Sequence, residues 1–169
     1  GGQIVNSFNR DIDYIFNNYG DDIGQKMAKM AFAGSELIRH RIKKYNIDCD
    51  LKHGNLFAAC NKKQFEELKA KKALWERHGH NELELLTADT IQDHIGSDRY
   101  AGGLLDKKGG HIQPLNLVLG QAKAFEELGG QIFEDSEVIR LEQGKPGKVV
   151  TKQGTVVADT IVVAGNAYM

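Results

Sequence analysis

The feature that most constrains this sequence is the apolar run at residues 160–165 (TIVVAG), which stops at a glycine. A continuous run rich in β-branched residues predicts a strand that is buried on both faces of a parallel sheet. A glycine at the carboxyl end of such a strand lets a ligand approach the backbone, since no Cβ stands in the way. An ordinary turn at Ala164 and Gly165 explains the same residues, so both interpretations stay open at this point.

The rest of the chain alternates helical and strand patterns. Apolar residues recur at helical spacing over residues 21–45, with Asp21 or Asp22 as the N-cap, and another helix opens at Pro114 and closes at glycines 129–130. The predicted buried face of this second helix consists of Leu115, Val118, Leu119, Ala122, Phe125 and Leu128. The other predicted elements are a strand over 54–60, a helix over 62–79, a short helix after a Thr87 cap, a short strand over 100–110, strands over 131–135 and 136–142, and a hairpin over 148–159. This order predicts a mixed α/β or α+β fold.

Composition excludes several classes of partner. The formal net charge of the 169 residues is −1, which gives no electrostatic reason to expect nucleic acid or an anionic membrane. No apolar stretch approaches the roughly 18 residues that a membrane span needs. Cys49 and Cys60 fall in no metal-binding or redox spacing, so the sequence predicts a reduced, cytoplasmic protein.

The sequence offers few candidates for catalysis. No G-x-G-x-x-G turn joins a hydrophobic strand to a helix, and no metal-binding spacing or nucleophile elbow is present. His40, His78, His80 and His94 lie among polar helix residues and are not predicted to be catalytic. His111 lies in a glycine-rich joint between a strand and a helix, where a structural role is favoured over catalysis. The sequence therefore names no catalytic residue and no metal site.

Three stretches taken together resemble a known family. These are GGQIVNSF at the start, GGLLDKKGGHIQPLNLVLGQAKAFEELGG in the middle and VVAGNAYM at the end. Their order and spacing resemble the FAD-dependent oxidoreductases of the D-amino-acid oxidase superfamily, and most of all the bacterial γ-glutamylputrescine oxidase-type amine oxidases. The resemblance implies a partial FAD/NAD(P)-binding Rossmann-like domain with part of an inserted substrate domain.

The resemblance also implies site residues. Gly1, Gly2 and Gln3 match the stretch that lies beside the isoalloxazine of FAD in this family. Val138 matches the strand whose backbone meets the adenine part of the cofactor, while Ala164 and Gly165 match a strand end that lies against it. On this interpretation the glycine at 165 is present so that the backbone can approach FAD.

The same resemblance predicts an organisation and a reaction. Residues 1–47 and 112–169 would belong to the FAD-binding domain and residues 48–111 to the substrate domain. The chain would be a fragment that lacks the dinucleotide fingerprint and the C-terminal part, inactive alone and prone to self-association. The complete enzyme would oxidise a C–N bond of an amine or amino acid by hydride transfer to flavin.

Two other interpretations of the sequence remain. A non-enzymatic α+β binding or interaction module accounts for the same elements if the strand-ending glycines are turns. A nicotinamide-dependent dehydrogenase is disfavoured, because neither the fingerprint nor its acidic partner downstream is present in the chain.

Overall fold

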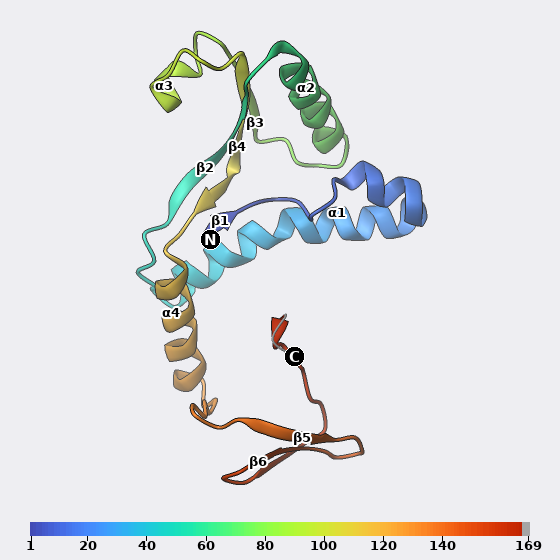
Figure 1. The fold of residues 1–169 in the computed structure, drawn as a ribbon, viewed down its shortest axis with the longest axis vertical. Coiled ribbons are helices and arrows are strands. Elements are labelled where there is room, and N and C mark those ends of the chain that lie inside the picture. Colours follow the sequence, from blue (N-terminus) through green and yellow to red (C-terminus); the bar gives the residue numbers. More distant parts are fainter. Residues whose placement is uncertain (167–169) are drawn as a thin grey trace. The chain divides into compact units, whose positions relative to one another are not determined.

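The computed structural model describes residues 1–166 of the chain, and it is a mixture of helices and strands, as predicted (Figure 1). The chain divides into two compact units, residues 1–127 and the part from Leu128 onward, and each is described by itself. The first unit contains β1 (Gln3–Ile4), α1 (Ile12–Lys44), β2 (Lys52–Ala59), α2 (Lys62–Arg77), β3 (Leu83–Thr87), α3 (Gln92–Ile95), β4 (Gly102–His111) and α4 (Pro114–Glu127). The second contains β5 (Val138–Glu142), β6 (Gly147–Thr151) and β7 (Thr155–Ala158).

The sheet of the first unit is organised around β4. β2 pairs with one edge of β4 over nearly its whole length, so β3 and β1 share the other edge, one after the other. All of the strand pairs among the described residues are antiparallel. The strand predicted to be short is ten residues long and includes both glycine pairs. A Cβ at Gly102, which has φ +148°, would lie 2.7 Å from the carbonyl oxygen of Leu86, so the close approach of β3 requires glycine there.

The core lies where α1 and α2 pack on this sheet. Trp75 of α2 is fully buried together with Ile12 and Ala28 of α1, Leu83 of β3 and Leu104 of β4. The indole Nε1 donates a hydrogen bond of 2.8 Å to Asp11, which also accepts from the backbone nitrogen of Ile12 and so caps α1. The core therefore joins the start of the long helix to the end of the next one.

The helix predicted over residues 21–45 is confirmed, but helical structure begins earlier. α1 starts at Ile12 and is interrupted at Gly20, whose φ of +76° is left-handed. Phe16 from the first part packs on Gly24 of the second, where an added Cβ would come within 2.6 Å of the ring. Asp21 follows this interruption, while the cap of the whole element is Asp11. The prediction began at Asp21 and missed these first turns, although Ile12 and Ile15 are buried there; the segment is short and ends at Gly20.

Two local predictions in the first unit are wrong. α3 begins after Ile91 and receives no side-chain cap; Thr87 instead hydrogen-bonds with Thr90 in the turn before it. The predicted buried face of α4 is largely exposed: Leu115, Val118, Leu119 and Phe125 are each at least half exposed, and Ala124 is the buried residue of this helix. Amphipathic spacing identified the helix, but did not show how far its apolar side chains are buried.

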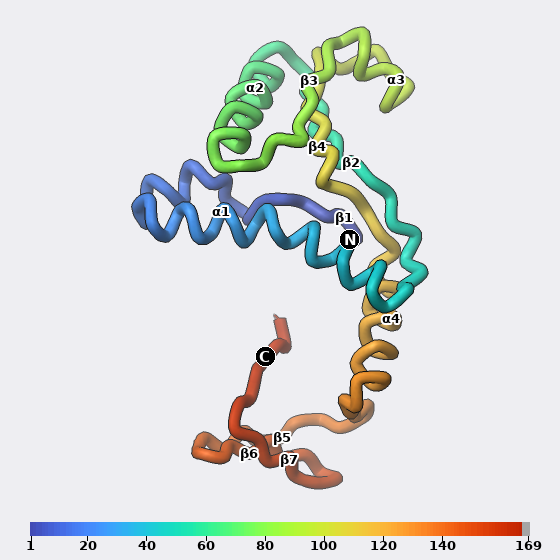
Figure 2. The backbone as a smooth tube through the Cα atoms, turned by 180° about the vertical axis from the view of Figure 1, so that it is seen from behind, coloured from blue at the N-terminus to red at the C-terminus, as the bar shows by residue number. Residues whose placement is uncertain are grey.

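The second unit is a three-stranded antiparallel sheet in the order β5-β6-β7 (Figure 2). The predicted hairpin and the strand within 136–142 are confirmed. Residues 131–135 form no strand, and residues 160–165 pair with no strand among the described residues, with Val162 82% exposed. A strand buried in a parallel sheet needs neighbours on both sides, and this part of the chain supplies none. The last three residues of the stretch VVAGNAYM lie outside the described residues.

Among residues 1–166, no helix combines the length and the apolar character required to cross a membrane.

Candidate functional site

The segment 1–3, predicted to lie beside the flavin, is held against the joint between β4 and α4. The backbone nitrogen of Ile112 donates to the carbonyl oxygen of Gly2 at 2.8 Å. Gly2 has φ +91°, and an added Cβ would lie 2.3 Å from the carbonyl oxygen of Ile112 and 3.2 Å from Pro114. Both the backbone angle and the space therefore require glycine at position 2.

Gln3 belongs to a polar row that crosses three strands. It pairs with His111 of β4, which pairs on its other side with Lys52 of β2. Directly opposed residues in antiparallel strands project from the same face of the sheet, and all three are exposed. Ile4, the next residue in β1, faces the other way and is buried, and α1 runs beside β1 in both views (Figures 1 and 2). His111, which the sequence placed in a structural joint, thus lies beside Gln3.

An ion pair lies at the end of this row. Lys52 contacts Asp50 at 2.7 Å, and the hydrogen bond and charge of Lys52 hold the pKa of the Asp50 carboxyl below its usual range. Both side chains are largely exposed, so this pair contributes little to stability. The pair places one positive and one negative charge beside His111.

The first unit also contains a buried polar cluster, formed by Asn6, His80 and Asp106. Each of the three residues is at most 1% exposed. Asp106 of β4 accepts hydrogen bonds from Asn6 Nδ2 and from His80 Nε2, each at 2.8 Å, and from the backbone nitrogen of Lys108 at 3.0 Å. Since an ionised carboxylate only accepts, the Nε2 of His80 carries a proton in this arrangement.

Electrostatics favour the ionised form of Asp106. Burial alone would raise the pKa of this carboxyl, but the hydrogen bonds from His80 and Asn6 outweigh burial and hold the pKa below its usual range. Two atoms of the cluster, Asn6 Oδ1 and His80 Nδ1, are buried without a hydrogen-bond partner among the described residues. The cluster is therefore built around the carboxylate, and the outer atoms of its partners are left unpaired.

Aromatic rings enclose the histidine of this cluster. Phe32 of α1 stacks on His80 with ring centroids 4.7 Å apart, and Trp75 meets it edge-on at 5.4 Å. His80 also lines a pocket of about 410 Å³, together with Lys108 and Glu36, which form an ion pair at 2.6 Å. This shell keeps water away from the Asp106 carboxylate, which strengthens its hydrogen bonds.

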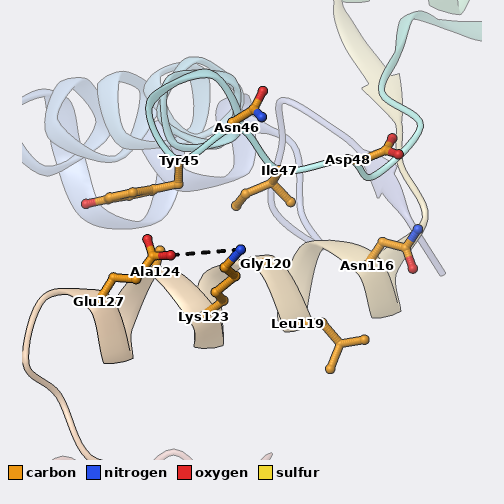
Figure 3. A pocket seen from close by; sticks show the side chains of 10 residues that line it. All are labelled: Tyr45, Asn46, Ile47, Asp48, Asn116, Leu119, Gly120, Lys123, Ala124 and Glu127. Carbon is orange, nitrogen blue, oxygen red and sulfur yellow. Dashed lines mark ion pairs between the residues drawn. The ribbon is translucent and has the colours of Figure 1, made fainter.

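A separate pocket of about 330 Å³ lies between the end of α1 and α4 (Figure 3). Ile47 points at α4, where an added Cβ on Gly120 would come within 2.3 Å of the Ile47 side chain. Polar groups line the pocket, including Asp48, Asn116 and the pair formed by Lys123 and Glu127 at 3.9 Å. The pocket is open and its polar groups are exposed, so it is a site of close helix packing rather than a catalytic arrangement.

The predicted adenine-side residue lies in the second unit. Val138 begins β5, an edge strand that pairs with β6 alone among the described strands. It lines a mostly apolar pocket of about 420 Å³ together with Phe133, Val149 and Val156. Ala164 and Gly165 belong to the unpaired stretch that follows β7. The roles of all these residues toward FAD stay predictions.

Within residues 1–166, no three His, Cys, Asp or Glu side chains converge in a way that could hold a metal ion.

The fold and the sequence together define a class of protein. Residues 2–169 match the family model described as FAD dependent oxidoreductase. The chain is 49% identical over its whole length to γ-glutamylputrescine oxidoreductase of Escherichia coli and 36% identical to a probable oxidoreductase, OrdL, of Haemophilus influenzae. It spans about 40% of the length of each of these curated relatives.

Two solved structures of similar fold are an L-amino acid deaminase and an L-proline dehydrogenase. The chain matches L-amino acid deaminase from Proteus myxofaciens with a TM-score of 0.77, at 15% identity, over 99% of this chain and 36% of that one. It matches L-proline dehydrogenase from P. horikoshii with a TM-score of 0.76, at 18% identity, over 99% of this chain and 42% of that one. The chain therefore has part of the mixed α/β, Rossmann-like fold of these enzymes and belongs to the family of FAD-dependent oxidoreductases of the D-amino-acid oxidase (DAO) type.

Sequence reasoning missed the buried cluster. Asn6 and Asp106 are 100 residues apart, and His80 was grouped with histidines on polar helices, although it lies in the loop after α2 and its own side chain is buried. The one local signal was Asp106 itself, an acidic residue inside a strand that is otherwise glycine, leucine, Lys107, Lys108 and His111. A charge in such a strand needs buried partners, which a search for spaced motifs does not look for.

Proposed function

We propose that this chain is the middle part of an FAD-dependent oxidoreductase that oxidises a C–N bond of an amine or amino acid, and that it is inactive by itself. The observation that carries the proposal is the match of residues 2–169 to the family, with 49% identity to the E. coli relative along the whole chain. The chain spans about 40% of that relative, which supports assigning the activity to a longer protein.

The residues proposed to contact FAD fit that role. Gly2 leaves no side chain beside the joint at residues 112–114, and Gln3 and His111 lie on an exposed face of the sheet. Val138 stands on an edge strand, whose outer N–H and C=O groups are available to a planar base, and beside an apolar pocket. Ala164 and Gly165 follow as an extended stretch without a strand partner in the described part. FAD would supply the acceptor for the hydride, and these residues would bind and orient it.

The finer features of the proposal follow the same family. Residues 1–47 and 112–169 are assigned to the FAD-binding domain and 48–111 to the substrate domain. The substrate class is a small amine or amino acid; this is supported by a curated relative named for γ-glutamylputrescine, and by two structural neighbours named for proline and for L-amino acids. A cytoplasmic location is supported by Cys49 and Cys60, which form no disulfide among the described residues.

Self-association of the isolated chain is part of the proposal. Large apolar side chains are exposed on α4, on β5 and β7 and in the stretch after β7, among them Leu119, Val157 and Val162. Exposed apolar patches and unpaired strand edges favour association.

The test is the visible absorption spectrum after FAD is added and the excess is removed. It compares the 169-residue chain with the full-length protein that contains it. We expect a flavin spectrum in the full-length protein and none in the isolated chain, and anaerobic addition of γ-glutamylputrescine should bleach it. A flavin that binds to the isolated chain and is bleached by the substrate would contradict the claim of inactivity. Absence of flavin from both proteins would favour the binding-module hypothesis.

A further inference from the structure

β1 is very short for a strand that carries a functional segment. It consists of two residues and makes two register pairs with β4, Gln3 with His111 and Ile4 with Gly110. So short a ladder does little to fix its own position, because ordering each residue costs roughly 1–2 kcal/mol of backbone entropy. Further contacts must hold the segment in place.

Two contacts bracket β1. Before the strand, the carbonyl oxygen of Gly2 accepts from the backbone nitrogen of Ile112. After the strand, the side chain of Asn6 reaches Asp106 inside the core. Asn6 is fully buried, whereas Val5 before it and Phe8 beyond it are more than a third exposed, so Asn6 anchors this end.

The carboxylate of Asp106 determines how Asn6 is oriented. An ionised carboxylate accepts and cannot donate, so the amide of Asn6 must present Nδ2 to it and leave Oδ1 unpaired. His80 and the backbone nitrogen of Lys108 take the other oxygen of Asp106, which fixes the carboxylate in turn. A hydrogen bond to a buried charge is stronger than one between neutral groups.

We propose that Asp106 is a positioning residue: through its buried hydrogen bond to Asn6 it sets the position of residues 1–3 against β4. The inference rests on the proposed function, in which residues 1–3 lie beside the flavin. Asp106 does not touch the cofactor on this proposal. It acts through Asn6, with His80 and Lys108 holding its carboxylate.

The test uses the full-length flavin-bound protein and three variants of the pair. Asn6→Asp places two carboxylates face to face. Asp106→Asn keeps a partner for Asn6, whose amide can turn so that Oδ1 accepts. The double variant, Asn6→Asp with Asp106→Asn, restores one carboxylate and one amide in exchanged positions. Asn6→Ala removes the hydrogen bond without adding charge and serves if Asn6→Asp fails to fold.

The readouts are the flavin absorption spectrum, the flavin midpoint potential and the dissociation constant for FAD. We expect Asn6→Asp to shift the spectrum and potential and to weaken FAD binding about tenfold or more, the scale of a buried polar group left without a partner. Asp106→Asn should have a smaller effect, and the double variant should return close to Asp106→Asn. Asn6→Ala should shift the spectrum and potential in the same direction as Asn6→Asp.

The matched control is Glu84→Gln, a change from carboxylate to amide on the same sheet. Glu84 pairs with Lys107 at 2.8 Å on the exposed surface, so its removal should leave the flavin readouts unchanged. A flavin spectrum and potential that stay as in the wild type in a folded Asn6→Ala or Asn6→Asp variant would overturn the inference, even if thermal stability falls. Failure of the wild-type full-length protein to bind FAD would instead contradict the proposed function.

Discussion

The two units of the chain bury their side chains to very different extents. The first unit has a core around Trp75 and a set of buried polar groups around Asp106, all joined by hydrogen bonds and aromatic contacts. In the second unit, Val138, Ile139 and Val157 are each more than half exposed, and Gly147 is the buried residue among those described. Both units have regular strands, but only the first has a buried core among the described residues, so strands can form here without a core.

The difference shows what each kind of sequence signal can do. Alternation about a turn is enough to form the hairpin of β6 and β7, because cross-strand pairs and turn geometry are local. A core needs contributions from distant elements, and the first unit brings α1, α2, β3 and β4 together. Four predictions sharpen this comparison.

The largest effect is expected from Trp75→Ala. Removing a fully buried indole leaves a cavity and deprives Asp11 of a donor, so the free energy of unfolding of the first unit should fall by about 3–5 kcal/mol. The measurement is denaturant unfolding followed by circular dichroism, with NMR amide shifts of β6 and β7 as the internal control. Those shifts should not move, and a loss of the hairpin signals would mean that the units do not fold independently.

A matched pair of glycine substitutions comes next. At Gly102 a Cβ would lie 2.7 Å from both the Leu86 carbonyl oxygen and the Phe65 ring at a left-handed φ, so Gly102→Ala should cost about 1–3 kcal/mol. At Gly154, between β6 and β7, a Cβ would have nothing within 4 Å, so Gly154→Ala should change stability by less than about 0.5 kcal/mol. Thermal unfolding measures both changes. An equal loss of stability at Gly102 and Gly154 would contradict the claim that the first unit is closely packed where the second is open.

Acid should weaken the first unit through Asp11. Burial would raise the pKa of this carboxyl, but hydrogen bonds from Lys71, Trp75 and the Ile12 backbone hold it below the ordinary value of 3.8. Because folding lowers this pKa, the Asp11 carboxylate contributes fully to the free energy of unfolding above about pH 4. That contribution is lost as the pH falls through the pKa of the folded state.

Asp11→Asn tests this assignment. The variant should lose on the order of 1 kcal/mol at neutral pH and should lose less stability than the wild type between pH 4 and pH 2. Asp13→Asn, at an exposed carboxylate in the same helical turn, is the control. An acid dependence in Asp11→Asn as steep as in the wild type would assign the effect to other groups, with Asp106 first among them.

The smallest effect on stability belongs to Val162→Ser in the second unit. Val162 is 82% exposed, so the free energy of unfolding should change by less than about 0.5 kcal/mol. Self-association of the isolated chain should nevertheless decrease, as measured by sedimentation equilibrium, because apolar surface is removed. Val162→Ile, which retains that surface, should associate like the wild type, and identical behaviour of both variants would exclude this stretch as a contact.

Much of the local structure could be predicted from the sequence. α2, α4, β2 and the hairpin follow from periodicity, turn residues and glycine stops, because these signals concern residues a few positions apart. Membership in the FAD-dependent oxidoreductase family was also predicted, from the order of three sequence stretches at the start, middle and end of the chain. The strand predicted at 160–165 shows the limit: its apolar pattern requires neighbouring strands that the described residues do not provide.

The positions of most helices and strands, and membership in the flavin-dependent oxidoreductases, could be predicted from the amino-acid sequence. Three features emerged only in the folded chain: β4 is the centre of its sheet, the apolar face of α4 is exposed, and Asn6, His80 and Asp106 meet. The two kinds of feature depend on interactions of different range along the chain. Hydrogen-bond geometry along the backbone repeats over a few residues, whereas a buried carboxylate obtains its partners from segments that come together only when the core forms.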